Sequence, residues 1–394
     1  MISFEKALEI LHQNIPAPQL ETISLCDSLN KVIAEDVFSD IDMPPFDKSA
    51  MDGYAVRSDD IKLPPVELEV LEVVPAGRVP TKIVKPGKAI KIMTGAPLPQ
   101  GADAVIMVEH TRYNAQIQTV CCFNTIKKSA NICFKAEDIK KGEKVISQDT
   151  KITPQHIGLL ASVGKDKLHV YKYPSITIIT TGDELIDITQ TPESAQIRNS
   201  NTYSLQSQLN KIGFKTISLG IVKDNIDILA EKISGGLKSD ILILTGGVSM
   251  GDYDIVEEVL KKIDTKILFN QVAIKPGKPF VFGKNNNCLV FGLPGNPVSV
   301  FVITEVFIKE LLSIVCKDST LKNRLMNANL TKPIEKSSDR QQYILAKLDS
   351  DKVEPIWGHG SADIISLTKA NAFIIMPPNS APFPIDSSVT VMVL

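Results

Sequence analysis

The chain has 394 residues, of which 43% are hydrophobic and 22% charged, a composition typical of a soluble globular protein with about two to four domains. Its 43 basic and 45 acidic side chains nearly cancel, which excludes the strong positive charge expected of a protein that binds nucleic acid or anionic lipid. The six cysteines form no C-x-x-C pair, the N-terminus does not resemble a signal peptide, and the most apolar run is too short to span a bilayer. We therefore expect a cytoplasmic protein with no nucleic-acid and no membrane partner.

The first predicted element is a helix over residues 2–14, whose apolar side chains recur on one face. From about residue 21 to 150 the segments are short, β-branched and interrupted by proline and glycine. This texture predicts a mostly β region, folded as a barrel or as layered sheets. Thr153 and Pro154 then indicate the capped start of a short helix within residues 151–164.

Strands and helices alternate from about residue 172. Strands are expected at 175–182, 216–224, 240–247 and 287–295, and helices at 201–213, 226–238, 254–263 and 297–315. Near-continuous apolar strands that alternate with helices predict a parallel sheet covered on both faces, in a doubly wound α/β domain. After about residue 321 the pattern becomes β again.

Three strand ends of the α/β region carry unusual turns, with the sequences TTGDEL (180–185), TGGVSMGD (245–252) and GLPGNPVS (292–299). In open α/β sheets, ligands bind outside the carboxyl ends of strands. Glycines and exposed N–H groups at a helix start favour a phosphate there. Plain turns with helix caps are the alternative, which is less favoured when three such turns follow consecutive apolar strands. The sequence contains neither a P-loop nor a dinucleotide-binding fingerprint.

Charged residues follow the same strand ends. Glu184, Asp224 and Asp252 are candidates for holding Mg²⁺ beside phosphate oxygens, and helix capping is an equal alternative for Asp224. Lys275 and Lys278 lie in the segment IKPGKP, where two prolines and a glycine stiffen the backbone. Paired ammonium groups on a rigid turn suit a compact polyanion, and a solvated surface turn is the alternative. The five histidines lack metal-ligand spacing, and no arrangement of a covalent nucleophile is apparent.

Another candidate is the carboxylate of Asp52, in the segment PPFDKSAMDGYAV (44–56). Asp52 lies between Met51 and Gly53, an unusual position for a charge that only keeps a surface hydrated. A turn-forming aspartate is the structural alternative.

Taken together, several motifs resemble one family, the MoeA/gephyrin E-domain family of molybdopterin molybdotransferases. The motifs are FDKSAMDGYAV, IMTGAPLPQGADAVI, TTGDEL, GGVSMGDYD, IKPGKP and GLPGNPVS. The similarity extends from about residue 3 to GHGSADIISLTKANAFIIMP near the end. It implies an enzyme of molybdenum cofactor biosynthesis that binds adenylylated molybdopterin, inserts molybdate at the dithiolene and releases AMP with Mg²⁺ as cofactor.

The resemblance also implies an architecture. The expected fold is a multidomain combination of a central doubly wound α/β domain, split β-rich N-terminal domains and a C-terminal β-barrel-like domain. The implied domains are an α/β domain III (1–20 and 171–320), a split domain I (21–40 and 141–170), a β-rich domain II (41–140) and a C-terminal domain IV (321–394). The family forms homodimers in which domain II of one protomer completes the active site of the other, and the molybdopterin adenylyltransferase is a further candidate partner.

Site residues follow from the motifs that match. The implied catalytic residues are Asp52, Thr94, Glu184, Asp224, Asp252, Lys275 and Lys278, with Glu184 and Asp252 as metal ligands. The implied substrate-binding residues are Asp138, Gly246, Gly247, Ser249, Pro294, Asn296, Pro297, Ser299 and Ser361.

The sequence departs from the family pattern at basic positions. Cys133 lies in a stretch that is rich in arginine in many relatives, Gln271 replaces a common lysine, and Leu345 replaces a common arginine. Either molybdate binds less tightly here, or Lys275, Lys278 and Arg340 carry more of its binding.

Two other functional classes are considered. A receptor-anchoring scaffold, as in gephyrin, would need a receptor groove and an attached adenylyltransferase domain or a long linker, which are not expected here. A nucleotide-processing hydrolase of the CinA type shares the α/β unit but leaves residues 41–140 and the last β region unexplained. Whether AMP release requires molybdate distinguishes the transferase from these two classes.

Overall fold

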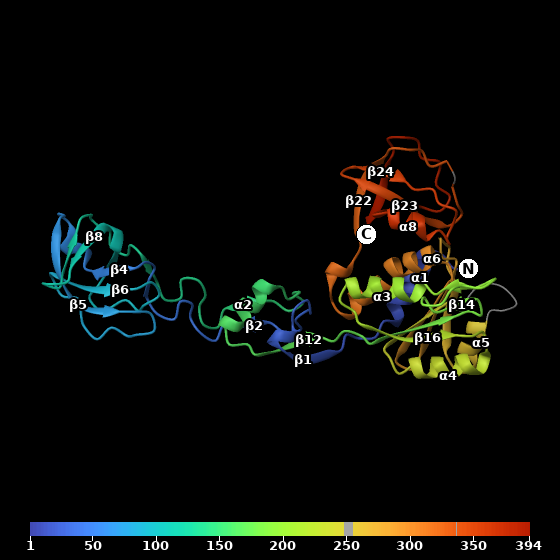
Figure 1. The fold of residues 1–394 in the computed structure, drawn as a ribbon, viewed down its shortest axis with the longest axis horizontal. Coiled ribbons are helices and arrows are strands. Elements are labelled where there is room, and N and C mark those ends of the chain that lie inside the picture. Colours follow the sequence, from blue (N-terminus) through green and yellow to red (C-terminus); the bar gives the residue numbers. More distant parts are fainter. Residues whose placement is uncertain (248–254, 336) are drawn as a thin grey trace. The chain divides into compact units, whose positions relative to one another are not determined.

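The computed structural model describes residues 1–247, 255–335 and 337–394, and its chain divides into two compact units that are each discontinuous in sequence (Figure 1). Unit 1 comprises Met1–Thr22, Asn30–Ala34 and His169–Leu394, and unit 2 comprises Ile23–Leu29 and Glu35–Leu168. The four-domain division expected from the resemblance stays a prediction. Among the described residues, no helix combines the length and the apolar character needed to cross a membrane.

The central sheet of unit 1 has six strands in the order β16-β13-β17-β21-β20-β18. Its strands are β13 (Ile176–Thr181), β16 (Thr216–Val222), β17 (Ile241–Thr245), β18 (Lys266–Gln271), β20 (Pro279–Asn285) and β21 (Cys288–Leu293). The first four strands in the sheet order are parallel, as predicted. Two further strands, β18 and β20, were not anticipated from the sequence, and they pair antiparallel. A two-residue connection joins β20 directly to β21, and so short a connection can only join antiparallel strands.

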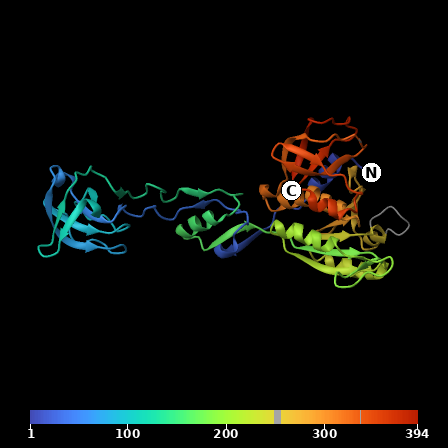
Figure 2. The ribbon, with the colours of Figure 1, turned by 45° about the horizontal axis from the view of Figure 1, so that its top comes forward.

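Helices cover both faces of this sheet (Figures 1 and 2). They are α1 (Phe4–Asn14), α3 (Asn201–Lys211), α4 (Ile226–Gly236), α5 (Ile255–Lys262), α6 (Pro297–Ile303) and α7 (Lys309–Val315), with a π-helical turn at Thr304–Ile308 between the last two. Side chains of β17 alternate between two separate cores: Ile241 and Ile243 pack with α1, α3 and α6, whereas Leu242 and Leu244 pack with α4 and α5. Since successive strand residues point to opposite faces, the continuous apolar run is explained by burial on both sides.

A second sheet, at the C-terminal end of unit 1, closes into a barrel. The ring of hydrogen-bonded strands is β23 (Gln341–Asp349), β24 (Lys352–Pro355), β22 (Arg324–Leu330), β26 (Ser388–Val393) and β25 (Ala372–Met376), which pairs again with β23. The short strand β19 (Ile274–Lys275) adds to β23, and helix α8 (Ile364–Lys369) lies between β24 and β25 in the chain. The predicted C-terminal barrel is confirmed, but the sequence analysis did not anticipate β22, β19 or α8.

Unit 2 is mostly β, as predicted. Its main sheet has the order β7-β4-β6-β5-β9-β8, formed by β4 (Gly53–Val56), β5 (Val66–Val74), β6 (Lys88–Ile92), β7 (Ala104–Met107), β8 (Thr111–Asn114) and β9 (Thr119–Cys122). Two short pairs join β2 (Val37–Phe38) to β11 (Lys144–Ile146) and β3 (Lys48–Ser49) to β10 (Ile132–Cys133). Helix α2 (Pro154–Ser162) begins at a capping box in which the side chains of Thr153 and His156 satisfy each other's backbone N–H groups.

The remaining elements are short. They are β1 (Leu20–Ser24), β12 (Lys167–Tyr171), β14 (Leu185–Ile186), β15 (Ile197–Arg198) and the 3₁₀ turns Leu25–Asp27, Ser58–Ile61, Val108–His110 and Ser319–Leu321.

Candidate functional site

The three predicted turns meet at one edge of the central sheet, because they follow the neighbouring parallel strands β13, β17 and β21. The N–H of Gly246 donates to the carbonyl oxygen of Leu293 at 3.1 Å. Gly246 also lies against the Thr181 carbonyl so closely that a Cβ atom would collide with it, and its φ of +88° is one that glycine adopts readily. The side chain of Asn201, at the start of α3, donates to the Gly295 carbonyl at 2.7 Å. The edge is therefore built from backbone in close contact.

Buried hydroxyl groups join the strand ends below these turns. Thr245 Oγ1 donates to Thr180 Oγ1 at 2.9 Å, and Thr180 Oγ1 lies 2.6 Å from Thr202 Oγ1 on α3. Asn199 Nδ2 donates to the same Thr202 oxygen at 2.9 Å. Because all four residues are buried, this chain of hydrogen bonds fixes β13, β17 and α3 relative to each other.

A cavity of about 780 Å³ opens beside the turns. Of the predicted site residues, its wall contains Glu184, Gly246, Gly247, Lys275, Lys278, Pro294, Asn296, Ser299 and Ser361. Residues of the C-terminal barrel complete the wall, among them Arg340, Gln342, Tyr343, Leu345 and Trp357. Within the described residues, the glycine-rich turns and Glu184 thus line one cavity. Ser249 and Asp252 lie outside the described residues.

The third turn is held by the barrel. Asn296 precedes α6, but its side-chain amide donates to Ser361 Oγ at 2.9 Å instead of capping the helix. The N–H of Val298 donates to the Ser361 carbonyl at 3.0 Å. Pro297 begins the helix without forming part of the cavity wall, and Ser299 is buried two residues further on. Ser361 thus joins two segments that are 65 residues apart.

The carboxylates at the strand ends differ in what they can do. Glu184 is exposed in the cavity wall. Its carboxylate lies close to Gly182, because a Cβ atom added to Gly182 would be only 2.7 Å from Glu184 Oε2. Asp224 is absent from that wall among the described residues: its Oδ1 accepts from Thr181 Oγ1 at 2.8 Å and its Oδ2 from the Asp183 N–H at 3.3 Å. These contacts favour a structural role for Asp224, which links the ends of β13 and β16.

Three cationic side chains also line the cavity. Lys275 is the last residue of β19 and lies across from Gln342 of β23, and Lys278 follows the turn at Gly277. Arg340 Nη1 donates to the Ile274 carbonyl at 3.4 Å, which places this guanidinium next to the same turn. Within the described ranges, neither Lys275 nor Lys278 pairs with a carboxylate. The cavity wall therefore contains two lysines and an arginine beside the glycine-rich turns, and the arginine Nε lies 3.7 Å from Asp339 Oδ1.

Three uncharged side chains in the wall complete the chemistry of the cavity. Burial raises the pKa of Tyr343 to about 12, so its phenol is neutral at physiological pH. Gln342 is 6% exposed, and its Nε2 is buried without a hydrogen-bond partner among the described residues. Leu345 is buried and contributes an apolar side chain.

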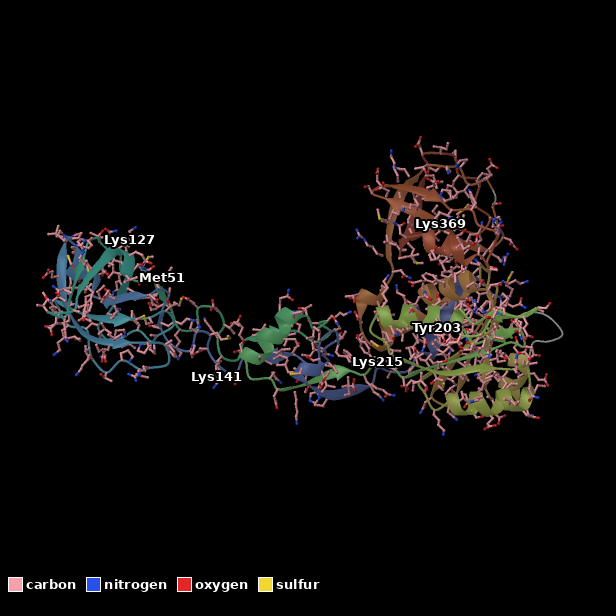
Figure 3. The ribbon with its side chains drawn as sticks, viewed as in Figure 1. Met51, Lys127, Lys141, Tyr203, Lys215 and Lys369 are labelled. Atoms are coloured by element: carbon pink, nitrogen blue, oxygen red, sulfur yellow. The ribbon has the colours of Figure 1, made fainter. Side chains whose placement is uncertain are left out.

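Asp52 and Thr94 lie side by side in unit 2. Asp52 Oδ1 accepts from the Thr94 N–H at 2.7 Å and from Thr94 Oγ1 at 2.8 Å, and these bonds hold the pKa of Asp52 below its ordinary value. No donor among the described residues reaches Oδ2, and the side chain is exposed. Figure 3 labels the preceding residue, Met51. Asp138 is exposed after β10, and its N–H donates to the Met43 carbonyl at 3.0 Å.

Comparison with known proteins decides the family. Family profiles described as the MoeA N-terminal region (domain I and II), a probable molybdopterin binding domain and the MoeA C-terminal region (domain IV) match residues 2–164, 177–313 and 327–394. The molybdopterin molybdenumtransferase of Bacillus subtilis is 34% identical over 389 residues, covering 95% of this chain and 90% of that protein. The chain belongs to the MoeA family. The molybdopterin molybdenumtransferase of Haemophilus influenzae is also 34% identical, over 95% of this chain and 94% of that protein.

A solved MoeA structure from Pyrococcus horikoshii has the same fold, with a TM-score of 0.84, 28% sequence identity, and coverage of 100% of this chain and 99% of that chain. A second MoeA structure from this organism has a TM-score of 0.79 and 31% identity, with both chains fully covered. These likenesses confirm the predicted MoeA-type fold. Membership of the MoeA family makes the protein a transferase of molybdenum cofactor biosynthesis.

Sequence reasoning missed part of the cavity wall. Gln342, Tyr343 and Trp357 were not anticipated, because no motif with a chemical rationale contains them and only the closing of the barrel brings them to the MoeA cavity. The one available signal was the Trp357-Gly358 pair at the end of a strand, where a large aromatic residue is followed by a glycine.

Proposed function

We propose that the cavity of unit 1 binds adenylylated molybdopterin, and that the protein inserts molybdate into it with release of AMP. The observation that supports this most is the meeting of glycine-rich turns and three cations, Lys275, Lys278 and Arg340, in one cavity. Backbone N–H groups at such turns bind phosphate oxygens, and ammonium groups without carboxylate partners bind a tetrahedral dianion. The names of the relatives, molybdopterin molybdenumtransferases, support molybdopterin as the acceptor.

In this proposal the protein acts by binding and charge stabilisation. In the cleavage step, an oxygen of molybdate or water forms a new bond to the molybdopterin-side phosphorus as the bridging P–O bond breaks, and the departing AMP phosphate takes the electron pair of the broken bond. At the dithiolene, two Mo–S bonds form as one Mo–O bond breaks, and that oxygen leaves as water with the two thiol protons. The turn residues Gly247 and Gly295 border the cavity where that charge develops, and Lys275 and Lys278 hold the oxyanion that reacts. Neutral Tyr343 and apolar Leu345 keep this part of the wall free of competing negative charge.

Mg²⁺ is the proposed cofactor, and the donor set at the cavity fits it. Proteins hold Mg²⁺ through one or two carboxylates together with substrate phosphates, and Glu184 offers an exposed carboxylate in the wall that also contains the phosphate turns. Asp252 is the second proposed ligand. Bound there, Mg²⁺ would neutralise negative charge on the phosphate oxygens.

We further propose that the protein is a homodimer in which Asp52 and Thr94 serve the cavity of the partner protomer. The two hydrogen bonds from Thr94 fix the carboxylate of Asp52 through Oδ1 and leave Oδ2 for a ligand. A molybdopterin adenylyltransferase is the proposed supplier of the substrate.

The experiment that tests the proposed function measures AMP release from adenylylated molybdopterin by the purified protein, with molybdate, with sulfate, or with neither. We expect rapid AMP release with molybdate and Mg²⁺ and little with sulfate, a tetrahedral dianion that cannot be inserted. AMP release at equal rates without molybdate would refute the transferase and would favour a nucleotide-processing hydrolase.

A further inference from the structure

Trp357, the single tryptophan of the chain, lies in the cavity wall instead of in a hydrophobic core. Its side chain is 59% exposed although it follows the buried end of β24. Burial of the large apolar surface of an indole stabilises a protein, and an indole in contact with water does not contribute this stabilisation. A residue of this kind in a cavity wall points to a ligand that covers it.

The backbone that carries Trp357 is held on both sides. The N–H of Ile356 donates to the Leu345 carbonyl at 2.7 Å, which continues the pairing of β24 with β23. Gly358 packs so closely against the start of α8 that a Cβ atom would lie 2.7 Å from Asp363 Oδ2, and the N–H of His359 donates to that oxygen at 3.0 Å. The indole is therefore presented from a fixed backbone, so a ligand that binds it has little loop ordering to offset.

The same loop reaches the phosphate-binding edge. Ser361, four residues after Trp357, accepts a hydrogen bond from the Asn296 side chain, and its carbonyl accepts from the Val298 N–H. One short, fixed segment thus connects an exposed aromatic surface with the turn GLPGNPVS. A ligand that carries both a flat ring and a phosphate can contact both ends of this segment.

We propose that the indole of Trp357 is the stacking surface for the fused nitrogen heterocycle of the substrate. A pterin and an adenine share this chemistry, since both are flat, bicyclic and electron-poor enough to stack on an indole face. The ring lies on Trp357 while the phosphates lie at the glycine-rich turns and near Lys275 and Lys278. This inference rests on the proposed function and adds the residue that recognises the ring.

A first experiment uses Trp357 as its own reporter, because no other tryptophan contributes to the fluorescence of the full-length protein. The protein is titrated with AMP and, separately, with ribose 5-phosphate, which has the same sugar and phosphate but no ring. If adenine is the stacked ring, AMP quenches or shifts the indole emission and ribose 5-phosphate does not.

A second experiment compares the wild-type protein with Trp357→Phe and Trp357→Leu by calorimetry, with AMP, a 6-substituted pterin monophosphate and ribose 5-phosphate as ligands. Calorimetry avoids the light absorbed by the pterin. For the stacked ring we expect an affinity order of Trp, Phe, Leu, with the leucine variant about 5- to 150-fold weaker than wild type, the range that corresponds to loss of one base–aromatic stack. The ligand that shows this order identifies the ring.

Ribose 5-phosphate is the internal control, since its affinity is expected to be the same in all three proteins. Equal weakening of all ligands in Trp357→Leu would mean a disturbed cavity and would overturn the inference. Unchanged affinity for both ring-bearing ligands would overturn it while leaving the proposed function standing. If neither ring-bearing ligand binds the wild-type protein, the proposed function and the inference fail together. A shift of the monomer–dimer equilibrium without any change in ligand affinity would mean that another protomer covers the indole, and would also refute the proposal.

Discussion

Replacement of Gly246 by alanine should destabilise the protein in two ways, through its backbone conformation and through a collision of the added Cβ atom. Gly246 has a φ of +88°, and an added Cβ would collide with the carbonyl oxygen of Thr181 on the neighbouring strand. The left-handed conformation costs a non-glycine residue about 1–2 kcal/mol, and the forced backbone shift adds about 1–3 kcal/mol on the scale of overpacked cores. We therefore expect Gly246→Ala to lower the free energy of unfolding of unit 1 by about 2–5 kcal/mol.

Gly220 offers a matched control in the same sheet. It has a φ of +83° in β16, yet a Cβ there would meet no atom within 4 Å. Gly220→Ala should therefore cost only the conformational part, about 1–2 kcal/mol, and should leave the turn beside Thr181 in place.

Two measurements test this reasoning. Urea denaturation followed by far-UV circular dichroism gives the loss of stability in each variant, and calorimetry gives the affinity for AMP. The difference between the variants isolates the collision, because both share the positive φ. The reasoning is refuted if Gly246→Ala and Gly220→Ala lose the same stability, or if Gly246→Ala binds AMP as tightly as wild type while Gly220→Ala does not.

Three further predictions concern Asp52, Leu345 and Asp363. If Asp52 acts in the partner's cavity, the Asp52→Asn and Glu184→Gln homodimers are each inactive. Purified heterodimers of the two variants should recover about half of the wild-type AMP release, because both substitutions fall in one site and the other site is intact. Heterodimers as inactive as the parent homodimers would show that both residues serve the cavity of one chain. Leu345→Arg introduces a basic side chain into the cavity wall and should lower the molybdate concentration needed for half-maximal AMP release, whereas Leu345→Met should not. An unchanged molybdate requirement in Leu345→Arg would contradict a binding role for this position. Hydrogen bonds from the Ser366 side chain and N–H hold the pKa of Asp363 well below its usual range. The stability that ionised Asp363 gives to the loop after Trp357 is therefore complete above the ordinary aspartate pKa, and it is lost as the pH falls towards the lowered pKa. The emission of Trp357 should follow this transition in wild type and not in Asp363→Asn, and the same acid transition in both proteins would disprove the assignment.

Local features made a large part of the fold predictable. The capping box at Thr153 and His156 begins α2 where the sequence indicates, because the two side chains satisfy N–H groups that are three residues apart. The apolar run of β17 indicated a strand buried on both faces, and its residues do alternate between two cores. The antiparallel pair β18 and β20 was not predictable in the same way, because its segment is dominated by the Pro-Gly turn between Lys275 and Lys278. Which neighbour such a strand pairs with depends on distant residues.

By itself, the sequence determined the chemical inventory of the MoeA cavity: glycines and prolines at the strand ends, paired lysines, and Glu184, all recognisable from residue type and spacing. The tertiary structure decided which of these residues face the cavity. Asp224 resembles Glu184 in the sequence, but Thr181 and Asp183 occupy its oxygens. Asn296 directly precedes α6, yet its amide donates to Ser361 in the turn between β24 and α8. Backbone conformation and periodicity arise from neighbouring residues, and sequence therefore reports them well. The direction and exposure of a side chain, including that of Trp357, depend on elements far along the chain that fold against it.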